Sequence, residues 1–386
     1  MTVRIIHHLF KQRIYHPAIA SLLRGLLQGL SWVYGAMSYI RNLCYDFNLR
    51  PIHRFDNAFV ISIGNIAVGG TGKTPCVAYM VRLLQDRFHI AVVSRGYGRK
   101  TRMDRIVNST DSAATVGDEP LQLYQQFEAT KHPPVIAVGN SRASIIAKVL
   151  QAHPQVQLIL LDDGFQHRSV HRDLNVVLTT FDNPFFLDQM LPLGTLREHK
   201  QAIQRADMVF VTKCPVALSE DKQAYFRQQI TAYKKRELPI FFTHLRYLPP
   251  IGFNIQEAFN KDAAIMLLTG IADTKPLVSY VKQTYQLVAH HAFSDHHMFT
   301  KRDVQQIVAA FTRIPQQKKC IFTTEKDAAR LLDPTIYPML QDIPIFLLPI
   351  AMHVGDQEAA LHAVLLDCIQ PKLPRMRSEY SRYSIA

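Results

Sequence analysis

The sequence predicts an α/β fold with a parallel sheet wrapped by helices, a second and smaller α/β domain, and an amphipathic helix at its N terminus. Three observations support this fold class. Apolar strands alternate with helices from about residue 55, the alternation restarts after about residue 235, and the first 45 residues are basic and periodic. The expected domains are therefore residues 1–45, 46–235 and 236–370, followed by a basic tail over 371–386.

Composition and charge narrow the class of protein. The chain has 386 residues, 48% of them apolar, as expected of a folded globular protein. Its formal charge of +13 suggests a polyanionic partner, namely nucleic acid, an anionic membrane or a phosphorylated substrate, with simple solubilisation as the alternative. The five cysteines are scattered without a C-x-x-C pair, which indicates neither a disulfide framework nor a zinc site and favours a reducing cytosol.

The first 45 residues favour a helix lying in a membrane interface. No acidic residue precedes Asp46, and the fixed charges are Arg4, Lys11, Arg13, Arg24 and Arg41. Apolar residues recur at steps of three and four, which places them on one helical face: Ile19, Leu22, Leu23, Leu26, Leu27, Leu30, Val33, Met37 and Ile40. Arg24 and Gln28 near the middle disfavour a span, and Trp32 suits a lipid–water boundary. The alternative is a helix packed on the protein's own core, and the depth to which it enters lipid stays open.

The next 190 residues read as alternating strands and helices. The expected strands are FVISIGNIA, HIAVVSRGYG, PVIAVG, VQLILLDDGFQH, LNVVLTT and ADMVFVTK. The expected helices are KTPCVAYMVRLLQDR, PLQLYQQF and SRASIIAKVLQAH. The smaller domain repeats the alternation in AAIMLLTGIAD, YQLVAHHAF, DVQQIVAAFTRI, KKCIFTTEKDAARL and IPIFLLPI. Strands with continuous apolar character are typical of a parallel sheet that is covered on both faces.

A glycine-rich loop at 67–74, AVGGTGKT, predicts a phosphate site. It matches G-x-x-x-x-G-K-[ST] except that Ala67 replaces the first glycine. The loop lies between a predicted strand and a predicted helix, so backbone N–H groups and the helix dipole converge on one anion. Lys73 can reach the outer phosphates, and the Thr74 hydroxyl can bind Mg²⁺. The predicted nucleotide cradle consists of Ala67, Val68, Gly69, Gly70, Thr71, Gly72, Lys73 and Thr74.

Two carboxylates complete the expected metal site. Asp162 and Asp163 end the apolar stretch LILLDD, at the sheet edge where ligands of such folds bind. Carboxylate and hydroxyl oxygens are suitable ligands for Mg²⁺. We therefore expect Thr74, Asp162 and Asp163 to serve the metal.

Nucleotide binding does not identify the acceptor, but the other polar motifs do suggest one. GNIAVGGTGKTP, SRGYGR, VGDEP, LDDGFQHR, LPLGTLRE, TKPL, DHHMFT and TEKDAARL occur in this order over about residues 20 to 335. Together they resemble the tetraacyldisaccharide 4′-kinase family, the lipid A 4′-kinases. The resemblance implies a phosphate-loop kinase fold with two α/β domains and an N-terminal membrane-associated helix at the cytoplasmic face of the bacterial inner membrane. It implies transfer of the γ-phosphate of ATP, with Mg²⁺, to the 4′-hydroxyl of a tetraacylated glucosamine disaccharide 1-phosphate, making lipid IVA.

The same resemblance implies roles for individual residues. Asp118 would be the base that takes the 4′-hydroxyl proton, with His296 orienting it, and His297 is the other candidate for that partner. Arg142 and Arg197 would neutralise charge on the transferring group, and Glu198 would join the magnesium ligands. The TEKD segment at 324–327 is expected to stabilise the second domain, with nucleotide contact as the alternative.

Two other functions are weighed against this interpretation. A phosphate-loop GTPase or metallochaperone would read guanine with [NT]-K-x-D, but Cys214 stands at the aspartate position of VTKC. A nucleic-acid-binding protein has net charge as its only support, since no recognition helix with clustered Arg/Lys appears in the sequence. We therefore expect an anionic lipid substrate and a membrane surface as partners, and no nucleic acid.

Overall fold

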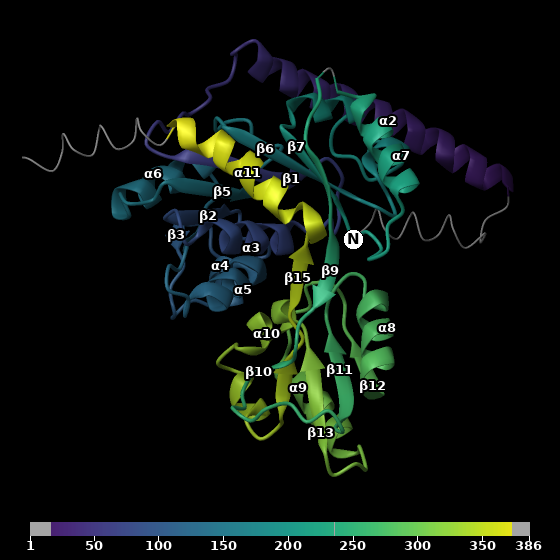
Figure 1. Ribbon diagram of the computed structural model, residues 1–386. Helices are drawn as coiled ribbons and strands as arrows, with labels where there is room; N and C mark the ends of the chain where they lie inside the picture. Colours follow the sequence, from purple (N-terminus) through teal and green to yellow (C-terminus); the bar gives the residue numbers. More distant parts are fainter. Residues whose placement is uncertain (1–16, 235, 373–386) are drawn as a thin grey trace, which may run out of the picture. The chain divides into compact units, whose positions relative to one another are not determined.

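The computed structural model describes residues 17–234 and 236–372 (Figure 1). Arg4, Lys11, Arg13 and most of the basic tail therefore lie outside the described residues. The chain divides into two compact units. Unit 1 takes the residues up to Val93, Ile146–Leu245 and those from Met352 onward, and unit 2 takes Ser94–Ile145 and Arg246–Ala351.

Unit 1 is built on a parallel sheet whose strands lie in the order β2-β5-β1-β6-β7-β8. The strands are β1 (Phe59–Asn65), β2 (Ile90–Ser94), β5 (Leu158–Asp162), β6 (Leu174–Thr180), β7 (Met208–Thr212) and β8 (Ile240–Phe242). All five pairings between them are parallel. Every residue of β1 is buried, as expected for a strand covered on both faces. The fold class predicted from the sequence is confirmed.

Helices cover this sheet because their apolar residues recur on one side. In α3 (Lys73–Leu84), the buried set includes Val77, Met80, Val81 and Leu84, the face expected from the sequence. The other helices with residues in unit 1 are α2 (Pro17–Asp46), α6 (Arg142–Ala152), α7 (Glu220–Thr231) and α11 (Glu358–Ile369), with short 3₁₀ turns at Phe185–Leu187, Lys200–Arg205, Gly355–Gln357 and Gln370–Lys372.

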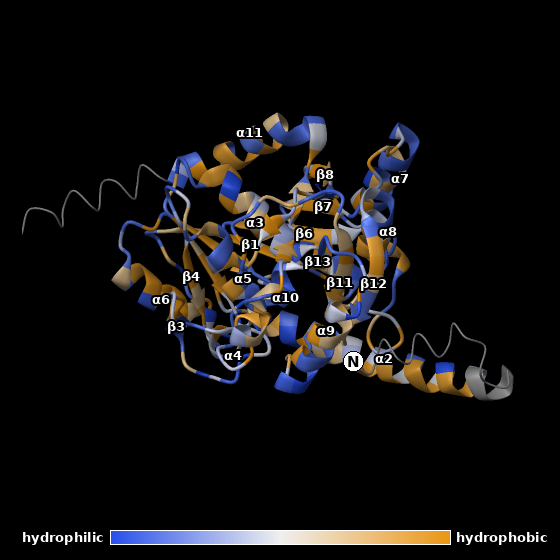
Figure 2. Ribbon diagram, turned by 90° about the horizontal axis from the view of Figure 1, so that it is seen from below, coloured by the Kyte–Doolittle hydropathy of each residue, from blue (hydrophilic) through white to orange (hydrophobic). Residues whose placement is uncertain are grey.

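Helix α2 turns its polar side to the protein. Ser31 is 3% exposed and donates to the Met190 carbonyl, and Leu27 is also buried. The apolar residues on its other side are 57% to 71% exposed: Leu22, Leu26, Leu30, Trp32, Val33, Met37, Tyr39 and Ile40. Figure 2 shows this helix as mostly hydrophobic along its length. Most of the apolar stripe therefore does not pack on the protein's own core, contrary to the alternative considered above. Among the described residues, no helix is both long enough and apolar enough to cross a membrane.

Unit 2 contains a five-stranded sheet in the order β10-β14-β13-β11-β12. Its strands are β10 (Ile251–Gly252), β11 (Ala264–Thr269), β12 (Gln286–Ala292), β13 (Lys319–Thr323) and β14 (Ile345–Leu347), and only β10 pairs antiparallel. Alternate residues of β11 face opposite sides, so Met266 packs with α9 (Lys301–Thr312) and Ile265 packs with α8 (Lys275–Thr284). The two helices thus cover opposite faces (Figure 1).

The remaining elements of unit 2 come from the middle of the first half of the chain and from the segment after β13. They are β3 (Arg105–Ile106), β4 (Val135–Val138), α4 (Ala113–Val116), α5 (Asp118–Phe127), α10 (Glu325–Leu331) and a 3₁₀ turn at Tyr337–Leu340. The chain crosses between the units in β9 (His244–Tyr247) and β15 (Ile350–His353), which pair with each other. The sequence predicts contiguous domains over 46–235 and 236–370, and this stays a prediction. Limited proteolysis would test whether these segments fold as separate units.

Candidate active site

The first polar cluster lies in unit 1, where the chain leaves β1 and enters α3. Gly69 and Gly72 have φ values of 114° and 85°, in the left-handed region that glycine adopts without strain. Gly72 is the N-cap residue of α3 and has no side chain to cap the N–H groups of the first turn. Lys73 and Thr74 are the first two residues of that turn. The loop therefore presents N–H groups and the positive end of a helix dipole to one anion.

Neighbouring segments hold the loop in this shape. The Val68 N–H donates to the Thr195 carbonyl at 2.7 Å. The Asn65 side chain donates to the Thr71 hydroxyl at 2.7 Å, and the Thr212 hydroxyl donates to the Thr71 carbonyl at 2.8 Å. Because both ends of the loop are anchored, little ordering is left to be done when a ligand binds.

The mismatch at Ala67 has a structural explanation. Ala67 forms an antiparallel bridge with Leu196, which is extended backbone that any residue adopts. A glycine is therefore not required at this position, and the imperfect motif match does not weaken the prediction of a phosphate loop.

A carboxylate and two cations meet beside the loop. The Lys73 ammonium lies 3.8 Å from Oδ1 of Asp163. Nη1 of Arg197 donates to both oxygens of Asp163, at 3.0 and 2.9 Å. Burial would raise the pKa of Asp163, but the charges of Lys73 and Arg197 hold that pKa below its ordinary value. Asp163 is therefore ionised at neutral pH.

The residues at the loop fit a magnesium ion. Asp162 is the last residue of β5, paired in register with Ile63 of β1, and Asp163 follows it with a φ of 51°. Their carboxylates and the Thr74 hydroxyl are hard oxygen donors beside a loop suited to phosphate. This donor chemistry is that of a magnesium site rather than of a zinc or copper site.

Glu198 lies elsewhere in unit 1. It is 0% exposed, one carboxylate oxygen lies 2.5 Å from Nη2 of Arg41, and the other accepts from Nη2 of Arg205. Both oxygens are therefore occupied by guanidinium groups. Metal binding by Glu198 stays a prediction.

The second polar cluster lies in unit 2, at the start of α5. Asp118 is the first residue of that helix and follows Gly117, which has a φ of 95°. A Cβ at Gly117 would lie 3.0 Å from the Tyr97 carbonyl oxygen, so both the conformation and the close approach call for glycine. The sequence VGD thus places a buried carboxylate at a helix N terminus.

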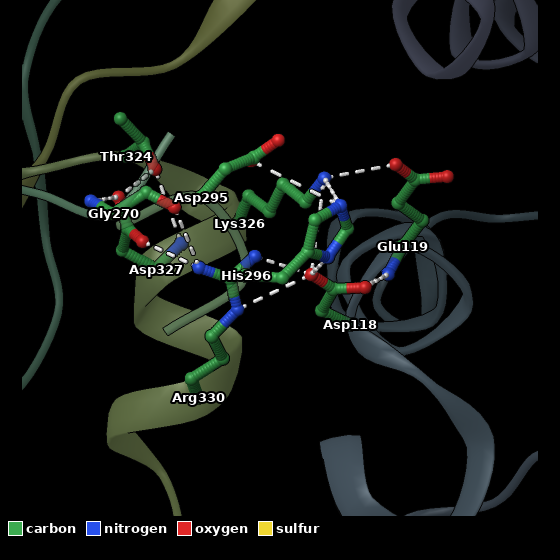
Figure 3. Close-up of polar contacts among 9 residues, drawn as sticks. All are labelled: Asp118, Glu119, Gly270, Asp295, His296, Thr324, Lys326, Asp327 and Arg330. Carbon is green, nitrogen blue, oxygen red and sulfur yellow. Dashed lines mark hydrogen bonds and ion pairs between the residues drawn. The ribbon is translucent and has the colours of Figure 1, made fainter. Parts of the chain in front are cut away.

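His296 and Lys326 form a chain of contacts with Asp118 (Figure 3). Nδ1 of His296 lies 3.0 Å from Oδ2 of Asp118, and Nε2 of the same ring lies 3.2 Å from the Lys326 ammonium. Because an ammonium has no acceptor, Nε2 accepts from Lys326 and the Nδ1–H donates to Asp118. Lys326 also donates to Oε1 of Glu119 at 2.9 Å.

Arg330 completes the cluster from the same helix as Lys326. Its Nε donates to Oδ2 of Asp118 at 3.2 Å, and its Nη2 donates to the same oxygen. Burial would raise the pKa of Asp118, but the hydrogen bond from His296 and the charges of Lys326 and Arg330 hold that pKa well below its ordinary value. Asp118 is therefore a carboxylate at neutral pH.

Two other predicted residues, His297 and Arg142, also have contacts in the structure. His297 lies 3.0 Å from Oδ2 of Asp303 and stacks on Phe293, so it is His296 that reaches Asp118. Arg142 begins α6, is 2% exposed, and donates to the Gly139 carbonyl at 2.8 Å. Its role in neutralising charge stays a prediction.

Several residues near these clusters had no predicted role. Lys213, the third residue of the VTKC stretch, has a φ of 58°, and its ammonium lies 4.0 Å from where a Cβ at Gly70 would stand. Arg41, Arg205 and Arg330 are the others. Lys326 was expected only as part of the TEKD segment, whose stabilising role stays a prediction. For Lys326 and Arg330 the sequence does carry a signal, because a spacing of four puts both on one face of a helix.

Comparison with known proteins identifies relatives over almost the whole chain. The family described as Tetraacyldisaccharide-1-P 4′-kinase matches residues 23–370. The Tetraacyldisaccharide 4′-kinase of Phocaeicola vulgatus is 36% identical over 355 residues, which cover 89% of this chain and 94% of the relative. That of Flavobacterium johnsoniae is 37% identical and covers 84% of this chain and 92% of its own.

A solved structure has the same fold. The crystal structure of LpxK from Aquifex aeolicus in complex with ATP is 26% identical and superposes with a TM-score of 0.71. The match covers 90% of this chain and 99% of that one. The likeness therefore extends into both units.

Proposed function

Because the chain belongs to the tetraacyldisaccharide-1-phosphate 4′-kinase family, it is an ATP-dependent kinase of lipid A biosynthesis, and we propose that the two polar clusters divide its work. Unit 1 binds the donor and unit 2 deprotonates the acceptor. The acceptor is the 4′-hydroxyl of a tetraacylated glucosamine disaccharide 1-phosphate. The observation that carries the assignment is the family match over residues 23–370, which contains every residue of both clusters.

In the donor half, the chain's own groups bind and neutralise the triphosphate of ATP. The N–H groups of residues 69–74 surround the phosphates, and Lys73 reaches the outer ones. Mg²⁺, held by Thr74, Asp162 and Asp163, would offset the charge that develops on the phosphate oxygens. Arg197 is held at Asp163 by a two-oxygen contact, which aims its guanidinium at the same place. Phosphoryl transfer depends mainly on positioning and electrostatics, which is what these groups supply.

In the acceptor half, Asp118 accepts the proton of the sugar hydroxyl. Its low pKa makes it a weak base, but it is fully in the form that can accept a proton. Its Oδ1 accepts the Glu119 N–H at 3.0 Å, whereas the side chains of His296 and Arg330 contact Oδ2. His296 orients the carboxylate, and Arg142 offsets charge on the transferring group.

The nucleotide-switch alternative is not favoured. The family is one of kinases, and the residue in the guanine-reading position is a cysteine. Cys214 is buried and donates its thiol to the Val211 carbonyl. A thiol facing its own strand does not read a base.

The exposed apolar side of α2 suits a membrane surface. Eight large apolar residues there are more than half exposed, which is unusual for a helix in water. An acceptor with four acyl chains also resides in a membrane. We therefore propose that α2 lies on the anionic cytoplasmic face of the bacterial inner membrane, and we expect no nucleic-acid partner.

The 4′-hydroxyl is tested by removing it. Purified protein with ATP and Mg²⁺ should release ADP in step with phosphorylation of the disaccharide 1-phosphate. The analogue with hydrogen in place of the 4′-hydroxyl should bind but should not gain a second phosphate. Equal phosphorylation of the analogue would show that a hydroxyl at another position is the acceptor, and this would overturn the assignment.

A further inference from the structure

We propose that Arg330 is a positioning residue for the transfer reaction, and that it fixes Asp118 so that one chosen oxygen receives the hydroxyl proton. The inference rests on the proposed role of Asp118 as the base. It concerns a residue in the second half of the chain, 212 positions from Asp118.

Arg330 uses all three of its nitrogens within unit 2. Nε and Nη2 donate to Oδ2 of Asp118, while Nη1 donates to Oδ1 of Asp327 at 2.8 Å and to the Gly270 carbonyl at 3.0 Å. Figure 3 shows the side chain reaching from α10 to Asp118 at the start of α5. A planar guanidinium can bridge these partners at fixed angles, and an ammonium cannot.

The far end of this bridge is itself held firmly. Oδ2 of Asp327 accepts the Gly270 N–H at 2.9 Å and the Thr324 hydroxyl at 2.7 Å. The Thr324 hydroxyl in turn accepts the Asp327 N–H and so caps α10. Arg330 is therefore fixed to the end of β11 and to the first turn of α10, and it transmits that rigidity to Asp118.

The two buried carboxylates of this cluster do not benefit equally from the buried cation that they share. The side chains of Arg330, Asp327 and Asp118 are 1%, 0% and 7% exposed, so one buried cation faces two buried carboxylates. Burial raises the pKa of Asp327 despite its contact with Arg330, whereas the pKa of Asp118 is lowered. The hydrogen bond from His296 and the charge of Lys326 also lower the pKa of Asp118. The cluster thus stabilises the ionised form of Asp118, the proposed base, more than it stabilises the ionised form of Asp327.

The contacts also distinguish the two oxygens of Asp118. Arg330 and His296 both donate to Oδ2, and Lys326 lies 3.8 Å from the same oxygen. Oδ1 accepts one backbone N–H, from Glu119. A carboxylate oxygen can accept two hydrogen bonds or more, so Oδ1 keeps a site for the sugar hydroxyl. Without Arg330, the carboxylate can rotate and this choice is lost.

Other charged and titratable groups surround this carboxylate and bear on any pH measurement. Helix α10 contributes Lys326, Asp327 and Arg330, and α5 contributes Glu119. The loop after β12 contributes Asp295 and His296, and the loop after β2 contributes Tyr97, whose ring packs on His296. None of these except Arg330 changes in the variants used below.

The test compares Arg330→Met with Arg330→Lys, and follows kcat, KM for ATP and the pH profile of kcat/KM. Arg330→Met keeps an unbranched apolar side chain and removes the guanidinium group with its charge and donors. We expect its kcat to fall by about 100-fold, as for a displaced catalytic group. The acidic limb of its profile should move upward by about 1 to 3 pH units, because an opposite charge is lost. KM for ATP should stay within about twofold, because the nucleotide cradle is unchanged.

Arg330→Lys separates charge from geometry. It should keep the acidic limb near its wild-type pH but still lose kcat, since an ammonium cannot bridge Asp118 and Asp327. Val304→Ala is the structural control. Val304 is fully buried on α9 and does not belong to the cluster, so this variant should lower stability and leave the pH profile in place.

The outcomes separate this inference from the role on which it rests. Loss of turnover in Asp118→Asn, together with an upward shift of the acidic limb of the kcat/KM profile in Arg330→Met, supports both the base role of Asp118 and the positioning role of Arg330. Loss in Asp118→Asn with a wild-type profile and kcat in folded Arg330→Met overturns the inference alone. Wild-type turnover in Asp118→Asn overturns the base role and the inference with it. If Arg330→Met does not fold, Arg330→Lys decides, since wild-type kcat there would also overturn the inference.

Discussion

Arg41 on α2 and Glu198 form an ion pair, with 2.5 Å between Nη2 of the arginine and Oε1 of the carboxylate. The residue before Glu198 is Arg197, whose side chain binds Asp163 beside the phosphate loop. Ser38, also on α2, donates to the Arg197 carbonyl at 3.4 Å. The helix with the exposed apolar side is therefore joined directly to the segment that carries Arg197, the cation proposed to act at the nucleotide site.

Arg41→Met should destabilise the protein because it leaves the buried Glu198 with Arg205 as its one remaining arginine partner. We expect a loss of about 1 to 3 kcal/mol in the free energy of unfolding, measured by urea denaturation. Glu198→Gln in the same chain should recover much of that loss, because no underpaired buried charge remains. If the single and double variants were equally destabilised, the ion pair would not be the cause.

Lys73→Ala should abolish transfer while the protein stays folded. The ammonium lies 3.8 Å from Asp163, and that carboxylate keeps its two-oxygen contact with Arg197 when Lys73 is removed. A fall in kcat of about 100- to 1,000-fold is expected from losing one charged stabiliser of the transition state. Circular dichroism and the unfolding midpoint serve as controls. Wild-type turnover in this variant would show that the loop does not take part in phosphoryl transfer.

Asp163→Asn should lower stability at neutral pH but not in acid. The folded-state pKa of Asp163 is lowered by Lys73 and Arg197 against the effect of burial. A lowered carboxyl pKa contributes stability above its unfolded value, near 4, and that contribution is lost as pH falls through the folded value. The stability difference between wild type and variant should therefore shrink below about pH 4. A difference that stays constant from pH 7 to pH 3 would argue against this ionic contribution.

The geometry of the glycine-rich loop and of the carboxylates beside it could be predicted because each is a local motif. The order of glycines, Lys73 and Thr74 predicts a strand–loop–helix, and Asp162 ends the neighbouring strand, with Asp163 directly after it. The apolar face of α3 was equally visible in its spacing. Local patterns of this kind determine local geometry, and the parallel sheet brings strand ends together.

The partners of buried charges could not be predicted in the same way. Arg41 and Glu198 are 157 positions apart, and Arg330 and Asp118 are 212 apart. Both pairings depend on how helices pack rather than on spacing along the chain. The apolar stripe of α2 was visible, but its direction was not, because Ser31 and Leu27 face the protein and Leu26 and Leu30 do not.

The outer side of α2 should govern binding to vesicles. Replacing Leu26, Leu30 and Val33 by serine should weaken partition onto phosphatidylglycerol vesicles by more than about tenfold, since each buried side chain is worth about 1.5 to 3 kcal/mol. Met103 and Val216 are 79% and 81% exposed on other elements, and their serine variants serve as matched controls. Equal partition of all variants would show that α2 does not contact lipid.

The most direct measurement follows the γ-phosphate itself. Purified protein is incubated with γ-labelled ATP, Mg²⁺ and the tetraacylated disaccharide 1-phosphate, with Lys73→Ala as the parallel control. We expect label on the lipid with the wild-type protein, and with the variant a rate of labelling about 100- to 1,000-fold lower. Label recovered only as inorganic phosphate, at the same rate with and without the lipid, would contradict a kinase and favour a nucleotide hydrolase.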